Sequence, residues 1–215
     1  MGLKRLKTAQ IPAKADIEKQ SKFLEKELEP KIEEAKQGKR QLFFIDASHF
    51  VLTAFLGYLW SFSRIFIKSP SGRQRYNILG AFNAITQDLI TITNDGYINA
   101  TCVIELMCKL IEKYGTIPIT LVLDNARYQR CRVVIEFAKE KGIELLFLPS
   151  YSPNLNLIER LWKFVKKKCL YCEYYETFMR FKGAIDDCLD NVNKKYADEI
   201  KSLMTLKFQV LKNAS

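Results

Sequence analysis

The sequence predicts an α/β domain in which helices cover both faces of a mixed sheet. In the first half of the chain, short apolar runs rich in Phe, Ile and Leu follow one another with only turns between them. Further on, such runs alternate with helical patterns that end at glycine. Strands joined by turns pair antiparallel, whereas strands separated by helices run parallel with right-handed crossovers. The expected order is three strands, helix, strand, helix, strand, helix.

Charge is the unusual feature of the composition. The chain has 215 residues, enough for one domain with a full core, and a formal net charge of +10. This balance favours a polyanionic partner, with nucleic acid ahead of an anionic membrane. No apolar run reaches membrane-spanning length and the N-terminus has no hydrophobic signal core. We therefore expect a soluble cytoplasmic protein that does not associate with membranes.

The N-terminal part predicts a linker and one helix. Residues 1–15 are basic and show no clear period, which is typical of a tail. From residue 16 to residue 37 the pattern is helical, with Asp16 as the cap and Gly38 as the stop. The apolar stripe of this helix consists of Phe23, Leu24, Leu28 and Ile32. Residues 1–40 are expected to form a basic linker and a helical arm.

The elements that follow are expected in this order. Strand-like segments are residues 41–50, 54–67, 75–86 and 88–93, with a turn at 68–74 that contains Pro70 and Gly72. Residues 99–114 predict a helix, 117–125 a strand, 126–141 a helix, 143–150 a strand and 156–168 a helix. The core is then residues 41–170, and residues 171–215 form an amphipathic helical segment packed on it.

The six cysteines are expected to be reduced thiols, because the chain has no secretory signal. Cys169 and Cys172 have the C-x-x-C spacing of many zinc ligands. No second pair completes such a site, and His49 is the only histidine. Buried or idle thiols are the favoured interpretation.

Three acidic residues stand where predicted strands end or a predicted helix begins. Asp46 closes an apolar strand, where an ionised carboxylate is costly unless it is paired or binds a metal. Asp124 closes the next long apolar run, and Glu159 lies in the first turn of a later helix. Ligands of open sheets bind beyond the carboxyl ends of the strands, so we expect these carboxylates to lie close together. Their oxygens suit hard divalent cations such as Mg²⁺.

Two of these acids also have a purely structural interpretation. Asp124 could cap a helix that begins near Ala126. Glu159 could be the capping-box partner of Asn156, which precedes it by three residues. Asp46 has no comparable purpose in an apolar strand. Because all three gather at one predicted edge of a basic protein, a metal site is the favoured interpretation.

Three segments resemble catalytic blocks of the DDE transposases of bacterial insertion sequences related to mariner. They are FFIDASHF at 43–50, LVLDNARYQR at 121–130 and LPSYSPNLNLIERLW at 148–162. The signature P-x-Y-S-P-x-L-N-x-I-E-x-x-W is intact, and 34 residues lie between Asp124 and Glu159, the spacing that this branch uses. The likeness covers nearly the whole chain from about residue 10 on. It implies an RNase H-like fold and an enzyme of the bacterial cytoplasm, associated with the nucleoid.

The resemblance also implies a catalytic mechanism. Carried over by position, Asp46, Asp124 and Glu159 form a triad that binds two Mg²⁺ or Mn²⁺ ions. Paired ions activate a water and stabilise the leaving oxygen of an in-line displacement at phosphorus. The freed 3′-hydroxyl of the element is then joined to a target phosphodiester, which is cut-and-paste transposition. Asn125 is expected to orient a water or a ligand from beside the triad.

DNA is the implied partner, as the terminal inverted repeats of the element and as the target, with the chain acting as a homodimer. The basic residues expected to hold phosphates are Arg73, Arg75, Arg127, Arg130, Lys163, Lys166 and Lys167. Any single one of them can equally be a solvated surface charge. Trp162 shares a helical stripe with Ile158 and Val165, so core packing is favoured over base stacking.

Two departures from the family pattern leave other functions open. Gln129 stands where family members often carry His, which affects any proton-handling or substrate-positioning role there. The first residues resemble the linker that follows a helix-turn-helix DNA-reading region, so that region is expected on a separate polypeptide, or the chain is a partial copy. The alternatives are a truncated, non-catalytic DNA-binding or transposase-inhibiting remnant, and an RNase H-like nuclease acting on RNA–DNA hybrids.

Overall fold

One mixed sheet organises the fold. The computed structural model describes residues 14–53, 60–68 and 74–208. Its strands are β1 (Gln41–Val51), β2 (Arg75–Asn83), β3 (Leu89–Asn94), β4 (Ile119–Leu123) and β5 (Glu144–Phe147), in the spatial order β3-β2-β1-β4-β5. β1, β2 and β3 pair antiparallel, while β4 and β5 continue the sheet in parallel. The predicted sheet, with three antiparallel strands followed by parallel ones, is confirmed.

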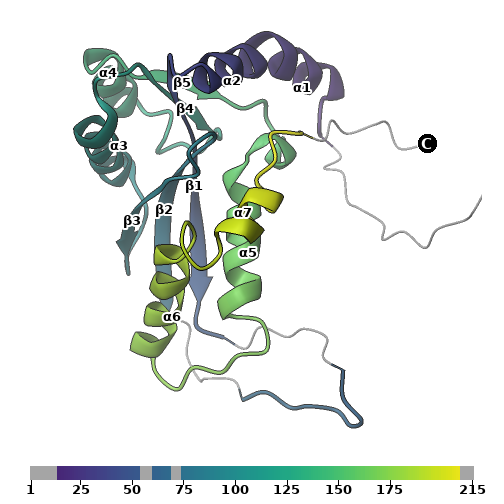
Figure 1. Cartoon of the computed structure of the whole chain (residues 1–215). Coiled ribbons are helices and arrows are strands. Elements are labelled where there is room, and N and C mark those ends of the chain that lie inside the picture. The colour runs from purple at the N-terminus through teal and green to yellow at the C-terminus, as the bar shows by residue number, and fades with distance from the viewer. Residues whose placement is uncertain (1–13, 54–59, 69–73, 209–215) are drawn as a thin grey trace, which may run out of the picture.

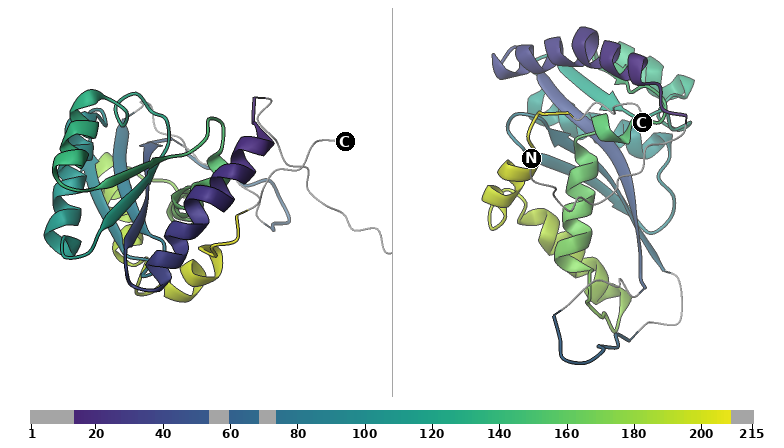
Figure 2. Two further views of the ribbon diagram at one scale, coloured as in Figure 1. Left: turned by 90° about the horizontal axis from the view of Figure 1, so that it is seen from above. Right: turned by 90° about the vertical axis from the view of Figure 1, so that its right-hand side faces the viewer.

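Helices cover both faces of this sheet, as predicted. α3 (Ala100–Tyr114) and α4 (Arg132–Glu140) lie on one side, and the N-terminal arm and α5 (Ile158–Cys169) lie on the other (Figures 1 and 2). α6 (Phe178–Asp190) and α7 (Ala197–Leu203) follow on the side of α5. Each face has its own buried apolar cluster. β1 is covered on both sides, which explains its unbroken apolar run, Leu42 to Ile45.

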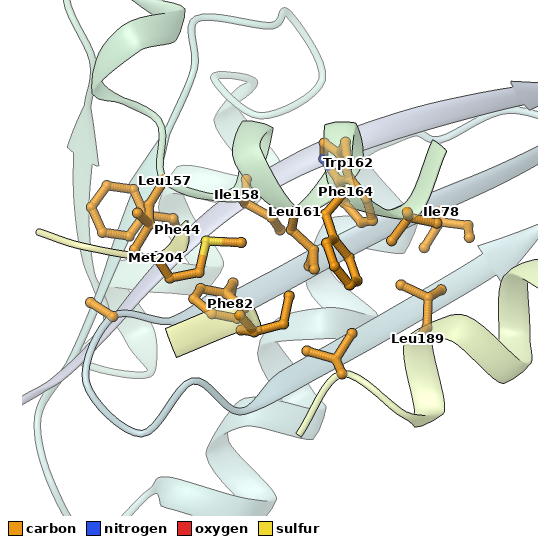
Figure 3. Packing of buried hydrophobic residues seen from close by; sticks show 14 of the residues in the cluster. Phe44, Ile78, Phe82, Leu157, Ile158, Leu161, Trp162, Phe164, Leu189 and Met204 are labelled. Carbon is orange, nitrogen blue, oxygen red and sulfur yellow. The ribbon is translucent and has the colours of Figure 1, made fainter. Parts of the chain in front are cut away.

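The face beneath α5 carries the larger cluster. Ile158, Leu161 and Trp162 of α5 lie over side chains of the sheet, among them Phe44 and Phe82 (Figure 3). The ring of Phe50 meets the indole of Trp162 edge to face, with their centroids 6.2 Å apart. α5 is thereby held at a fixed height above β1 and β2.

The N-terminal arm consists of α1 (Ile17–Phe23), a π-helical turn (Leu24–Leu28) and α2 (Glu29–Lys36). Asp16 caps it by accepting a hydrogen bond from the Lys19 amide at 3.0 Å, and Gly38 ends it at φ 73°, both as predicted. The wide π turn immediately precedes Pro30, which has no N–H to donate and whose ring clashes with a regular preceding turn. The predicted apolar stripe is buried against the same face of the sheet as α5.

Ion pairs fasten the end of the arm to β5. Lys31 contacts Glu144 at 2.8 Å, and Arg40 contacts both Glu34 and Glu144 at 2.7 Å. Hydrogen bonding to Arg40 lowers the pKa of Glu34. The arm is therefore attached by a buried stripe along its length and by charges at its C-terminal end.

Two predicted segments need correction, and others lie outside the described residues. Residues 60–68 form no strand, and Trp60, Phe62 and Phe66 are exposed there, because an apolar run becomes a strand only where another strand is available to pair with it. Residues 54–59 and most of the predicted turn, 69–73, lie outside the described residues, as do 1–13 of the predicted tail. The second correction, the start of α4, belongs to the site described below.

The segment after α7 returns along α5 to the sheet. Arg160 of α5 donates hydrogen bonds to the backbone carbonyls of three alternate residues, Leu203 at 3.2 Å, Thr205 at 2.7 Å and Lys207 at 3.0 Å. Phe208 then stacks on Phe44 with their ring centroids 5.9 Å apart. Within the described residues, the predicted C-terminal helical segment thus consists of two helices followed by a non-helical stretch that Arg160 holds against α5.

The six cysteines are free thiols, as expected. Cys169 is buried at the end of α5 and donates to the Val165 carbonyl at 2.9 Å. None of the helices within residues 14–53, 60–68 and 74–208 combines the length and apolar character that crossing a bilayer requires.

Candidate active site

Strand register places Asp46 and Asp124 side by side. Phe44 of β1 pairs with Val122 of β4 in the parallel register. Two residues further along each chain, on the same face, are Asp46 and Asp124. β4 ends at Leu123, whereas β1 continues to Val51. Asp46 therefore lies within its strand, and the prediction that it stands at the strand's end is wrong. Beyond this level β1 has no parallel neighbour, and the sheet opens beside the two acids.

Asp124 does not cap a helix. Its Oδ1 accepts a hydrogen bond from the Ala126 amide at 2.9 Å, which closes a local turn. The amides of Gln129 and Arg130 both reach the Ala126 carbonyl, and α4 begins only at Arg132. The helix predicted from Ala126 is therefore six residues shorter at its start, because the turn after Asp124 takes up the intervening backbone.

Glu159 arrives from the other side of the cavity, on the first turn of α5. The capping box with Asn156 is absent: α5 has Leu157 at its N-cap and no side-chain cap bond. The Asn156 amide instead donates to the Ile45 carbonyl at 3.3 Å. Asn156 therefore fastens the start of α5 to the residue next to Asp46, and the capping interpretation of Glu159 is wrong.

The three acids line one cavity of about 400 Å³. The rest of its wall comes from the loop after β5 and from the turn after β4, namely Asn125, Ala126, Leu148, Pro149, Ser150, Tyr151, Ser152, Pro153 and Asn156. A cavity lined by three carboxylates can hold a hard cation together with a small anionic group.

The carboxylates influence one another. Burial, followed by repulsion from Glu159 and from Asp124, raises the pKa of Asp46 to about 7. The pKa of the Tyr128 hydroxyl is also raised, first by burial and then by Asp124 and Asp46. In both groups the repulsion from neighbouring carboxylates adds to the effect of burial, and a bound cation would offset that repulsion.

Trp162 contributes a contact that the sequence did not predict. It is 2% exposed, as expected for core packing, and its Nε1 also donates to Asp46 Oδ2 at 3.0 Å. Gly80, which pairs with Asp46 across β1 and β2, makes room for the indole: a Cβ there would lie 2.8 Å from Trp162 Cη2. Trp162 follows Glu159 by three residues, so both lie on one face of the helix. This spacing is the feature of the sequence that could have predicted that Trp162 lies near the acids.

We expect Gly80→Ala to displace the Trp162 ring and to destabilise the protein by about 1–3 kcal/mol, because the added methyl overpacks a rigid contact. Gly183→Ala is the matched control, since a Cβ at Gly183 in α6 meets nothing within 4 Å and helical Ala is favoured over Gly by up to about 1 kcal/mol. Urea unfolding followed by Trp fluorescence measures both. Equal stabilities of the two variants would contradict the close approach.

The three carboxylates have the chemistry of ligands for a divalent cation, but their side chains do not form a complete metal site. Within the described ranges, no group of three or more His, Cys, Asp or Glu side chains is placed to hold a metal ion. The three carboxylates nevertheless supply hard oxygen ligands to one cavity and repel one another there. Asn156 Oδ1 is buried in the same wall and accepts no hydrogen bond from the described residues. A cation would require a further approach of the acids.

Two residues beside the cavity have structural partners. Asn125 donates to the Leu148 carbonyl at 2.5 Å and accepts from Arg130 at 2.7 Å, so it joins the turn after β4 to the end of β5. Gln129 is fully buried and lies 3.4 Å from the Tyr128 hydroxyl. Its side chain is thus packed inside the turn and does not line the cavity.

The predicted phosphate-binding residues are spread over the molecule. Arg73 lies outside the described residues, and Arg75 begins β2 five residues from Gly80, about 17 Å along the strand from the level of Asp46. Lys166 shares the helix face of Glu159, seven residues further on, with its ammonium over the Phe50 ring. Arg127 and Arg130 are exposed and follow Asp124 by three and six residues. Lys163 and Lys167 line an open groove against α7.

A family model described as DDE superfamily endonuclease matches residues 41–182. The chain belongs to this family. A comparison with curated proteins found no significant match.

The solved structures that the fold matches include transposase complexes. The Mos1 transposase paired-end complex with left transposon end superposes with a TM-score of 0.64 at 13% identity, covering 97% of this chain and 69% of that one. The catalytic domain of Mos1 mariner transposase matches with a TM-score of 0.56 at 13% identity, covering 92% of this chain and 100% of that one. The RNase H-like fold and the resemblance to mariner-related DDE transposases are therefore confirmed.

Proposed function

We propose that this chain is the catalytic domain of a DDE transposase, which cuts and joins DNA strands with Mg²⁺ or Mn²⁺. One observation carries the proposal: Asp46, Asp124 and Glu159, from two strands and a helix, line a single cavity. The membership of the DDE superfamily endonuclease family supports it. Structures of Mos1 paired-end complexes have been solved with Mn and with Mg, which agrees with the oxygen ligands found here.

The chain's own residues would bind and orient the reacting groups. Two divalent ions held by the three carboxylates would supply water activation and stabilise the leaving oxygen. Trp162 holds one oxygen of Asp46 in place, and Asn125 fixes the turn that carries Asp124. In the first step a water oxygen bonds to phosphorus as the bond to the 3′-oxygen of the element breaks, which leaves a 3′-hydroxyl and a 5′-phosphate. In the second step this 3′-oxygen bonds to a phosphorus of the target as the bond from that phosphorus to the target's own 3′-oxygen breaks.

DNA is the proposed partner, because the net charge is +10 and the exposed Arg127 directly follows Ala126 of the cavity wall. Lys166 and Arg127 are the phosphate contacts that we place nearest the scissile bond. The matched Mos1 structures include paired-end and strand transfer complexes. By analogy, we propose that two copies of this chain hold two element ends in the bacterial cytoplasm.

A nicking assay with three substrates tests the function. We expect Mn²⁺-dependent cleavage of a duplex carrying the element's terminal repeat when the helix-turn-helix reader is supplied, and far weaker cleavage of a scrambled duplex. An RNA–DNA hybrid serves as the third substrate. Preferential cleavage of the hybrid would identify a general nuclease instead, and DNA binding without cleavage of any substrate would identify a non-catalytic domain.

A further inference from the structure

Gln20 is an exception on the N-terminal arm. Most polar residues of α1 point to solvent, yet Gln20 is fully buried. Burying an amide is costly unless its donor and acceptor groups find partners. The partners of Gln20 therefore indicate what the arm is placed to hold.

Both ends of the Gln20 amide contact the loop that forms the cavity wall. Its Oε1 accepts from Asn154 Nδ2 at 3.0 Å, and its Nε2 lies 3.5 Å from the Tyr151 carbonyl as a donor. The partners are 134 and 131 residues away in sequence. Gln20 thus joins two points of one short loop to a helix from the other end of the chain.

The contacted loop has a backbone that needs support. Tyr151 has a φ of 59°, in the left-handed region that residues with a Cβ adopt at a cost. Surrounding contacts must hold such a residue in place, and the Gln20 contact is made to its own carbonyl oxygen. Tyr151 also lines the acid cavity.

The same loop determines where Glu159 stands. It continues through a 3₁₀ turn (Pro153–Leu155) to Asn156, whose side chain is bonded to the Ile45 carbonyl, and α5 begins two residues later. A shift at Asn154 is therefore passed over a few residues to the first turn of α5. The position of this turn therefore affects how Glu159 stands relative to Asp46 and Asp124, which line the same cavity.

We propose that Gln20 is a positioning residue for the metal-binding carboxylates: by clamping Tyr151 and Asn154 it sets the distance of Glu159 from Asp46 and Asp124. This inference rests on the proposed function, because it assumes that the three acids bind divalent cations. The arm is then a part of the active site, although none of its residues touches the acids.

Gln20→Met tests the clamp, because Met fills a similar volume but forms neither hydrogen bond. Ile32→Val is the matched control: Ile32 is buried on the same arm and belongs to its apolar stripe, and its side chain has no hydrogen bond to lose. Gln20→Glu keeps the acceptor toward Asn154 and loses the donor toward Tyr151. Mn²⁺ affinity without DNA is measured by calorimetry, and amide hydrogen exchange is followed over residues 150–156.

We expect Gln20→Met to weaken Mn²⁺ binding about tenfold and to speed exchange in the loop, in line with losses on removing groups that support metal ligands. Gln20→Glu should fall between wild type and Gln20→Met, and Ile32→Val should match wild type in both readouts. The inference is overturned if Gln20→Met lowers the melting temperature but leaves Mn²⁺ affinity unchanged, since Gln20 would then serve stability alone. Absence of Mn²⁺ binding by the wild type would overturn the proposed function, and this inference with it.

Discussion

Asp124→Asn is expected to reduce metal-dependent cleavage roughly a thousandfold or more, to the background of the assay. The substitution removes one negative charge and one hard ligand from the cavity. It keeps an oxygen that can accept the Ala126 amide hydrogen bond, so the turn after β4 should survive. Cleavage rates on terminal-repeat DNA across a Mn²⁺ titration, together with circular dichroism, measure both consequences.

Asp190→Asn is the control for this loss. Asp190 is an exposed carboxylate at the end of α6, outside the cavity, so its neutralisation changes net charge equally without touching the site. We expect its cleavage rate to stay within about twofold of wild type. Persistent cleavage by the Asp124 variant would remove that residue from the catalytic triad.

Asp46→Asn should abolish cleavage and, without metal, make the protein more stable at high pH. The pKa of Asp46 is raised from 3.8 to about 7 by burial and by Glu159 and Asp124. The folded state therefore holds a proton that the unfolded state releases above pH 3.8. This group's contribution to wild-type stability is fully present below pH 3.8 and is lost as the pH rises to about 7.

The stability gain of Asp46→Asn should grow over the same interval and level off above pH 7, at about 2–4 kcal/mol. Unfolding free energies at pH 5 and pH 8 in EDTA measure it. Mn²⁺ should restore stability to the wild type and have little effect on the variant, because the cation offsets the repulsion only where the ligand is present. A gain that is the same at both pH values would contradict a raised pKa for Asp46.

The sequence was sufficient to predict the sheet, its mixed direction and the two faces, because apolar runs and glycine stops are local signals. It also predicted that Asp46 and Asp124 would meet, since both follow apolar residues of parallel strands. It did not predict that Asp46 lies inside β1. That depends on β4 ending at Leu123 while β1 continues, and relative strand length is a property of the pairing.

The local interpretations failed where a distant partner was stronger. Asn156 has the spacing of a capping box with Glu159, but its side chain is bonded to the backbone of β1. α4 begins later in the sequence than predicted, because Asp124 closes a turn instead of capping a helix. The contacts of Trp162 with Asp46 and of Gln20 with Asn154 join residues more than 100 positions apart, which periodicity does not reveal.

Arg160 has a consequence for anyone who wishes to attach a cargo or a tag to this enzyme. The residue next to Glu159 is bonded to carbonyls as far along as Lys207, so the last described stretch behaves as a strap over α5. A fusion joined beyond Phe208 leaves the strap in place. A fusion joined directly after Leu203 would remove Thr205 and Lys207, and with them three of the oxygens that accept hydrogen bonds from the half-buried Arg160 guanidinium. Arg160 stands next to Glu159, one of the proposed metal ligands.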